Sequence, residues 1–117
     1  MRFALIGHTG HWRTYVPVLQ AYPDTTLAAV APASEVDRPG GFDHAPGLTE
    51  STRWYATAEE LLARERLDWV QICARSDRTA PLALACLERG IPVVAEKPLA
   101  MDEAALARLW RDYERVP

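Results

Sequence analysis

Lysine is almost missing from this sequence: Lys97 is the only one, and the other twelve basic residues are arginine. Cysteine is also scarce. Cys73 and Cys86 form no C-x-x-C pair, so we expect two buried thiols rather than a disulfide or a metal pair. No apolar run approaches the roughly 20 residues that span a bilayer, and the N-terminal apolar stretch is too short for a signal peptide. The sequence predicts a cytoplasmic protein without a membrane partner.

The composition favours one globular domain over residues 1–117, with 49% hydrophobic and 25% charged residues. The net charge is −3, and the basic residues are scattered rather than grouped. Nucleic-acid binding is therefore not indicated, because a basic patch is its usual signature.

Short apolar runs alternate with segments of helical periodicity, which predicts a three-layer α/β/α domain with a parallel sheet. The expected strands cover residues 2–7, 26–31, 52–56, 68–74 and 91–96. The expected helices cover residues 10–21, 57–66, 78–89 and a last segment capped by Asp102. We expect Pro17 to kink or end the first helix, Pro81 to lie in the first turn of the third, and residues 32–50 to form a loop.

Ligands of such sheets bind beyond the carboxyl ends of the strands. The loop GHTGHW, residues 7–12, follows the first strand and opens a helix, where N–H groups can hold a pyrophosphate. The glycine fingerprint G-x-G-x-x-G falls on Gly7, Thr9 and Trp12, with Gly10 between them, so only its first glycine is in place. Phosphate binding and a plain turn both stay open, and Trp12 is expected to push the helix outward.

His8 and His11 in the same loop have the spacing H-x-x-H. A metal site would need further cysteine or carboxylate ligands, and none lies nearby in sequence. We therefore predict no metal, and two histidines that face the surface or a ligand.

Two further loops offer weaker signals. After the second strand, Pro32 stands where dinucleotide-binding domains usually carry an acid for the ribose, with Ser34 and Glu35 just beyond. No arginine adjoins this strand end to receive a 2′-phosphate, and Arg38 is the nearest along the chain. After the fourth strand come Ala74, Arg75, Ser76, Asp77 and Thr79, of which Ser76, Asp77 and Thr79 can cap a helix or contact a ligand.

The segment EKPLA, residues 96–100, is the sharpest signal. It places Lys97 at the carboxyl end of a predicted parallel strand, facing the ligand crevice. Pro98 restricts Lys97 to extended backbone, and Glu96 can orient its ammonium group. A lysine so placed can donate a proton or polarise a carbonyl. The alternative is a surface salt bridge, although arginine would be the usual choice for one in this chain.

At this point the sequence resembles the glucose–fructose oxidoreductase/inositol dehydrogenase/MocA family. The resemblance rests on AEKPLA and APLALACLERGIPVV, and on the register of Pro17 and Leu19 with the family's first helix. It implies a Rossmann-type domain that binds NAD or NADP. It also implies that Lys97 assists proton transfer during hydride exchange with a sugar, polyol or related hydroxy compound.

The resemblance implies cofactor contacts from Gly7, His8, Thr9, Gly10, His11, Trp12, Pro32, Ala74, Arg75, Ser76, Thr79, Glu96 and Lys97. Several of these depart from the family pattern: Thr9 and Trp12 replace glycines, and Pro32 replaces the ribose acid. Family members also have a sixth strand and a C-terminal substrate domain, so we expect this chain to lack both and to be inactive alone. The alternatives are a degenerate module that senses a nucleotide without catalysis, and an interaction domain that pairs through the exposed fifth strand as a homodimer.

Overall fold

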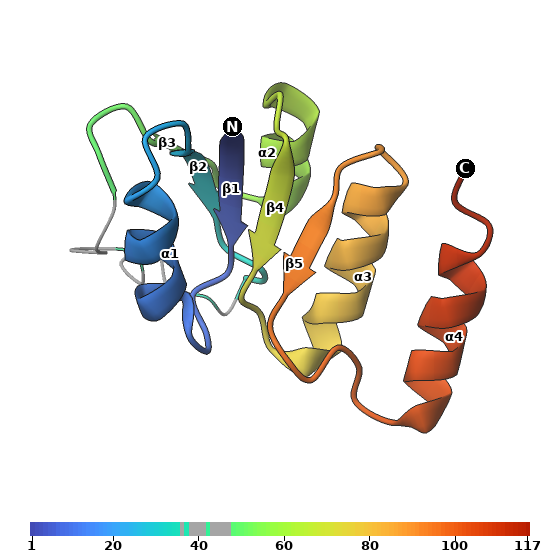
Figure 1. Cartoon of the computed structure of the whole chain (residues 1–117). Helices are drawn as coiled ribbons and strands as arrows, with labels where there is room; N and C mark the ends of the chain where they lie inside the picture. The colour runs from blue at the N-terminus through green and yellow to red at the C-terminus, as the bar shows by residue number, and fades with distance from the viewer. Residues whose placement is uncertain (36, 38–41, 43–47) are drawn as a thin grey trace.

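The computed structural model, which describes residues 1–35, 37, 42 and 48–117, has one parallel sheet in the order β3-β2-β1-β4-β5 (Figure 1). The strands are β1 (Arg2–Ile6), β2 (Thr26–Ala31), β3 (Arg53–Trp54), β4 (Trp69–Ile72) and β5 (Val93–Ala95). The helices are α1 (Trp12–Gln20), α2 (Ala58–Arg64), α3 (Ser76–Leu87) and α4 (Glu103–Tyr113). The predicted α/β architecture is confirmed, and β5 is an edge of this sheet.

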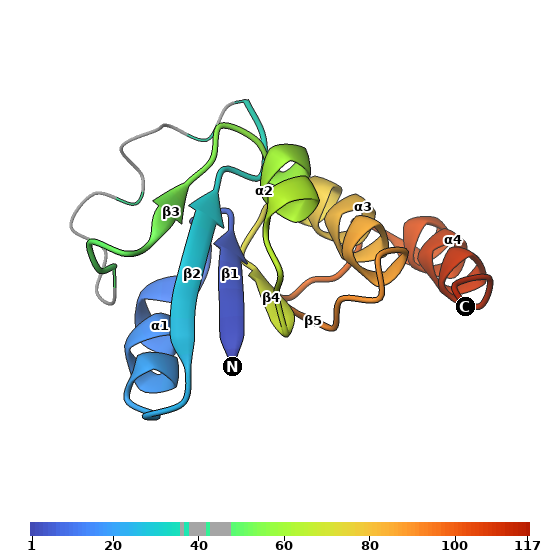
Figure 2. The ribbon, with the colours of Figure 1, turned by 90° about the horizontal axis from the view of Figure 1, so that it is seen from above.

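The two faces of the sheet bury different side chains, because successive residues of a strand point in opposite directions. On β1, Phe3 and Leu5 join a core with Trp12 and Val16 of α1. Ala4 and Ile6 join a second core, which contains the buried faces of α2 and α3. Helices therefore cover both faces, as Figure 2 shows.

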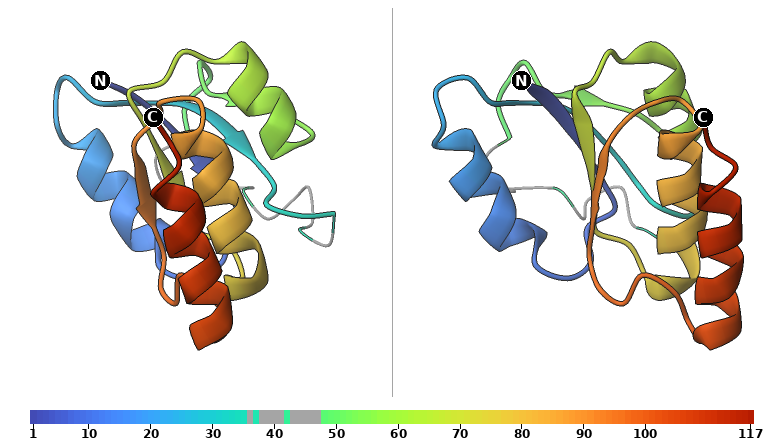
Figure 3. Two further views of the ribbon diagram at one scale, coloured as in Figure 1. Left: turned by 90° about the vertical axis from the view of Figure 1, so that its right-hand side faces the viewer. Right: turned by 45° about the vertical axis from the view of Figure 1, so that its right-hand side comes forward.

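Helix α4 stands apart from the sheet and lies beside α3 (Figure 3). None of its residues is buried, and Leu106, Trp110 and Tyr113 are exposed despite their size. Asp102 is its N-cap, as predicted, and the Asp102 carboxylate accepts the Ala105 N–H at 2.7 Å.

The structure corrects the position of one of the two helical prolines. Pro17 lies inside α1, as predicted, and the helix continues past it to Gln20 instead of ending there. Helix α3 begins at Ser76, two residues earlier than predicted, which moves Pro81 beyond the first turn. Both helices gain more from burying an apolar face against the sheet than one missing backbone hydrogen bond costs them.

Other expectations hold with small shifts. Cys73 and Cys86 are buried free thiols, and burial raises the pKa of Cys73 to about 12. Thr57 caps α2 by accepting the Glu60 N–H at 3.1 Å. Of the predicted loop at 32–50, residues 36, 38–41 and 43–47, Arg38 among them, lie outside the described residues. No helix in the described part of the chain is long and apolar enough to span a membrane.

The turn after β1 gives a stability prediction, because Gly7 has φ +84° and lies against β4. A Cβ at Gly7 would overlap the Cys73 carbonyl, whereas one at Gly90, with φ +71°, would meet open space. Gly90→Ala should cost about 1–2 kcal/mol of unfolding free energy, the usual cost of left-handed backbone. Gly7→Ala should cost at least about 2 kcal/mol more, measured by urea denaturation. Equal losses in the two variants would contradict this close approach.

Candidate functional site

Four strands of the parallel sheet, β1, β2, β4 and β5, end at the same edge, and backbone hydrogen bonds hold the loops that follow them together (Figure 1). The Gly7 N–H donates to Ala31 at the end of β2, at 2.9 Å. The Glu96 N–H donates to Ile72 at the end of β4, at 2.8 Å. The predicted candidate residues after these strands therefore gather on one side of the domain.

The turn between β1 and α1 is fixed against the end of β4 by Thr9. Its backbone N–H and its hydroxyl both donate to the Cys73 carbonyl, at 2.9 and 2.8 Å. The Thr9 hydroxyl, a candidate for contact with the cofactor, is therefore engaged inside the protein. The N-terminus of α1 still opens toward the strand ends.

Trp12 does not push α1 outward, which corrects the prediction. Its side chain is 3% exposed and lies in the core beneath the turn. The indole N–H donates to the His8 carbonyl at 2.8 Å, and the ring meets Phe42 edge-on at 5.8 Å. Arg13 covers the outer face of the ring at 4.6 Å.

Glu96 connects the end of β5 to the start of α1. Its carboxylate lies 2.9 Å from Nδ1 of His11 and accepts the His11 N–H at 3.4 Å. Gly10 permits this approach, since a Cβ there would lie 2.8 Å from Cγ of Glu96. The hydrogen bond from His11 lowers the pKa of Glu96 although burial opposes this. Partial burial, and next the Glu96 carboxylate, raise the pKa of Tyr15 on α1.

The two histidines of the turn point to different partners. His11 binds Glu96, whereas His8 packs edge-on against Phe42 at 5.3 Å. The Nε2 atom of His8 is buried, and no described residue bonds it. Within the described residues no three His, Cys, Asp or Glu side chains form a metal-binding group.

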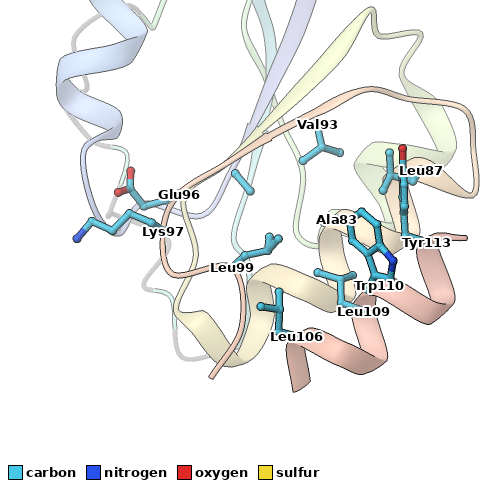
Figure 4. A pocket seen from close by; sticks show the side chains of 11 residues that line it. Ala83, Leu87, Val93, Glu96, Lys97, Leu99, Leu106, Leu109, Trp110 and Tyr113 are labelled. Atoms are coloured by element: carbon cyan, nitrogen blue, oxygen red, sulfur yellow. The ribbon is translucent and has the colours of Figure 1, made fainter. Parts of the chain in front are cut away.

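Lys97 is exposed at the end of β5 and makes no ion pair with any described residue. Glu96 was expected to orient its ammonium group, but binds His11 instead. Figure 4 shows both side chains projecting away from the apolar residues beside them. The peptide bond between Lys97 and Pro98 is cis.

At the end of β2 the structure brings together residues that the sequence did not connect. Asp37 accepts the N–H groups of Ala33 and Ser34 at 2.6 and 3.2 Å, just beyond the half-buried Pro32. Arg78 of α3 donates from Nε to the Ala33 carbonyl at 3.2 Å. Asp37 bonds residues three and four positions before it in the same loop, a local turn that the sequence analysis did not single out. Arg78 was missed because its contact joins α3 to the loop after β2, 45 residues away.

The loop after β4 differs from the predicted cap. Arg75 is the N-cap residue of α3, and its side chain makes no capping hydrogen bond. Arg75 pairs with Asp77 at 3.2 Å, while Ser76 donates to the Met101 sulfur at 3.1 Å. The buried hydroxyl of Thr79 donates backward to the carbonyls of Arg75 and of Ala74, which is itself buried.

An apolar groove lies beside Lys97, between α3, β5 and α4 (Figure 4). We call it the α3–α4 groove, and it is lined by Ala83, Leu87, Val93, Ala95, Glu96, Lys97, Leu99, Leu106, Leu109, Trp110 and Tyr113. Only the end near Glu96 and Lys97 is charged. The groove follows the unpaired edge of β5.

The sequence of residues 1–116 matches the glucose–fructose oxidoreductase/inositol dehydrogenase/MocA profile, described as an oxidoreductase family with an NAD-binding Rossmann fold. The chain belongs to this family. It is therefore an NAD-binding Rossmann domain of an oxidoreductase family, which confirms the resemblance. Among curated proteins, none matches.

Solved structures agree on the fold. KijD10, a 3-ketoreductase from Actinomadura kijaniata in complex with NADP, is 27% identical with a TM-score of 0.70. An NAD-binding protein from Listeria innocua is 25% identical with a TM-score of 0.72. The alignments cover 99% and 98% of this chain but 36% and 32% of those proteins. The chain thus spans about a third of the length of its structural relatives.

The Glu96–His11 pair predicts how stability depends on pH. The lowered pKa of Glu96 means that its charged form is favoured in the folded state. This contribution is present above the ordinary value of 4.5 and is lost as the pH falls through the lowered value. Glu96→Gln should cost about 1 kcal/mol at pH 7, because solvent screens the His11 side of the pair.

Urea denaturation of both proteins at a series of pH values between neutral and strongly acidic measures this difference. The difference in unfolding free energy between wild type and Glu96→Gln should shrink once Glu96 is protonated. Glu60→Gln is the matched control, because Glu60 pairs with Arg64 on the surface at 3.2 Å. If the difference in unfolding free energy stayed constant down to acid pH, the Glu96 carboxylate would not stabilise the folded state as proposed.

Proposed function

We propose that this chain holds NAD or NADP along the carboxyl edge of its sheet for hydride exchange with a sugar, polyol or related hydroxy compound. The observation that carries the proposal is the position of Lys97. It lies at the end of β5, next to the residue that contacts the glycine turn through His11. An exposed lysine without an ion pair among the described residues is available to a ligand.

The turn is compatible with a pyrophosphate. Gly7 and Gly10 both have positive φ, and the space beside each is too narrow for a side chain. Helix α1 has no acidic residue in its first turn, so its N-terminal dipole can attract an anion. Thr9 and Trp12, which depart from the fingerprint, turn into the protein and leave the mouth of the turn clear.

The bound nicotinamide would accept or give the hydride. Lys97 would hold the substrate hydroxyl and move its proton as the hydride moves. Glu96 would position the strand end against α1 through His11. The rest of the substrate site would come from outside these residues, because the relatives are about three times longer. We propose that the chain alone does not turn over substrate.

The choice between NAD and NADP rests on the end of β2. Glu35 can accept hydrogen bonds from ribose hydroxyls, and Arg78 carries a guanidinium suited to a phosphate. Both line one pocket with Ser34, Arg75 and Asp77. The pocket thus holds a group suited to each cofactor, and the binding experiment tests both.

Calorimetric titration of the chain with NADH, and separately with NADPH, tests the proposal. We expect saturable binding of at least one of them. Gly10→Asp should weaken it at least tenfold, since the new carboxylate would lie beside Glu96 at the mouth of the turn.

Gly90→Asp is the matched control, because Gly90 has a similar φ but open space at the far end of α3. It should bind as the wild type does, with folding checked by circular dichroism. A folded wild-type chain that binds neither nucleotide would contradict the proposed function.

A second function is favoured by the edge of β5, namely pairing of two copies as a homodimer. Val94 is 53% exposed on this edge, and the apolar α3–α4 groove adjoins it. An unpaired strand of this kind is a template for another strand. Pairing without nucleotide binding would make the chain an interaction module rather than part of an enzyme.

Sedimentation over a range of protein concentrations tests this pairing. A homodimer should dissociate on dilution, and Val94→Lys should leave a monomer, because lysine on an edge strand opposes pairing. Ala63→Lys is the control, on an exposed residue of α2, which packs on β2 rather than on β5. A wild type that stays monomeric at all concentrations would contradict pairing.

A further inference from the structure

His11 has an unusual environment for an exposed residue. It immediately precedes α1, and its side chain is 59% exposed, yet one ring nitrogen binds a carboxylate that is only 6% exposed. The structure gives Nε2, the other ring nitrogen, no hydrogen-bond partner within the described residues. Nδ1 of the ring is therefore bound to Glu96, whereas Nε2 is available to a ligand. The ring lies at the start of α1, where the proposed dinucleotide would bind.

The lowered pKa of Glu96 fixes the direction of this hydrogen bond. Glu96 is ionised at neutral pH and can only accept, so Nδ1 of His11 carries the hydrogen. In a neutral imidazole, Nε2 is then an acceptor and faces solvent with a lone pair. A phosphate oxygen is also an acceptor, so the neutral ring cannot bind it. Only the protonated ring presents an Nε2–H donor.

Several donors of the turn are already engaged within the protein, which leaves mainly the backbone N–H groups at the start of α1 for an incoming pyrophosphate. The Thr9 N–H and hydroxyl are both used by the Cys73 carbonyl. The His11 N–H is directed at Glu96, and the Trp12 indole binds the His8 carbonyl. Glu96 itself adds a negative charge where a dianion would arrive, which opposes binding unless a positive charge forms beside it.

The charged and titratable groups around His11 leave its imidazole as the group that can respond near neutral pH. Glu96 is already ionised, and the Cys73 thiol, with its pKa raised to about 12, stays neutral. The raised pKa of Tyr15 keeps that phenol neutral. Arg13, two residues after His11, and Lys97, next to Glu96, bring positive charge to this region. His8, in the same turn, is the other imidazole nearby.

We propose that His11 takes up a proton from solvent when the dinucleotide binds, and then donates Nε2–H to the pyrophosphate while Glu96 holds Nδ1–H. This inference rests on the proposed dinucleotide binding. It adds a charged side-chain donor from His11 to the backbone N–H groups at the start of α1. It also makes affinity depend on pH, with tighter binding on the acidic side of neutrality.

Proton uptake can be measured directly by calorimetry. NADH is titrated at pH 7.5 in PIPES and in Tris, whose ionisation enthalpies differ, and the difference in heat gives the number of protons bound. Wild type should take up about half to one proton as the His11 ring becomes charged on binding. The affinity should fall about threefold to tenfold for each pH unit between about 6.5 and 8.5.

Three variants test whether the proton belongs to His11. His11→Asn should bind more weakly at pH 6.5, show uptake near zero, and have an affinity that hardly changes with pH. His8→Asn should keep the wild-type uptake, because its imidazole packs against Phe42 rather than Glu96. Glu96→Gln removes the opposing charge, so its affinity at pH 8.5 should rise above that of the wild type.

Binding without proton uptake in the wild type would overturn the role of His11 and leave dinucleotide binding intact. Uptake that persists unchanged in His11→Asn would also overturn it. Absence of binding at every pH would overturn the proposed function itself, and this inference with it. The three results are distinguishable in one set of titrations.

Discussion

The candidate site depends on one close contact, between the turn after β1 and the end of β4. The Cys73 carbonyl accepts two hydrogen bonds from Thr9 and leaves no room for a side chain on Gly7. This contact fixes where α1 begins. Because the dipole of a helix acts mainly at its first turn, it also fixes where an anion is favoured.

The position of Glu96 follows from that of α1. With the turn held on β4, Gly10 comes within reach of the residue after β5, and only a glycine there leaves space for the carboxylate. Glu96 then bridges two loops that lie far apart in sequence. The EKPLA segment is thereby connected to the turn after β1 through a buried charge and an exposed imidazole, rather than through Lys97 itself.

The sequence predicted the features that depend on local patterning. Strands buried on both faces appear as continuous apolar runs, and the caps at Thr57 and Asp102 follow from side chains that bond their own helix. Contacts between loops could not be predicted this way. The His11–Glu96 pair joins residues 85 apart, and Arg78 meets Ala33 across 45 residues. Such pairs depend on strand order and register, which no single segment encodes.

Trp12 replaces a glycine of the dinucleotide fingerprint without displacing the start of α1. A glycine at this position lets helix and strand pack closely, so a large ring would be expected to separate them. The ring instead lies in the core, where Phe42 packs against it and Trp54 packs against Phe42. Aromatic rings that meet edge-on fill this space with favourable contacts. The substitution has therefore altered the packing beneath the turn, whereas α1 still begins at the strand ends where an anion can reach it.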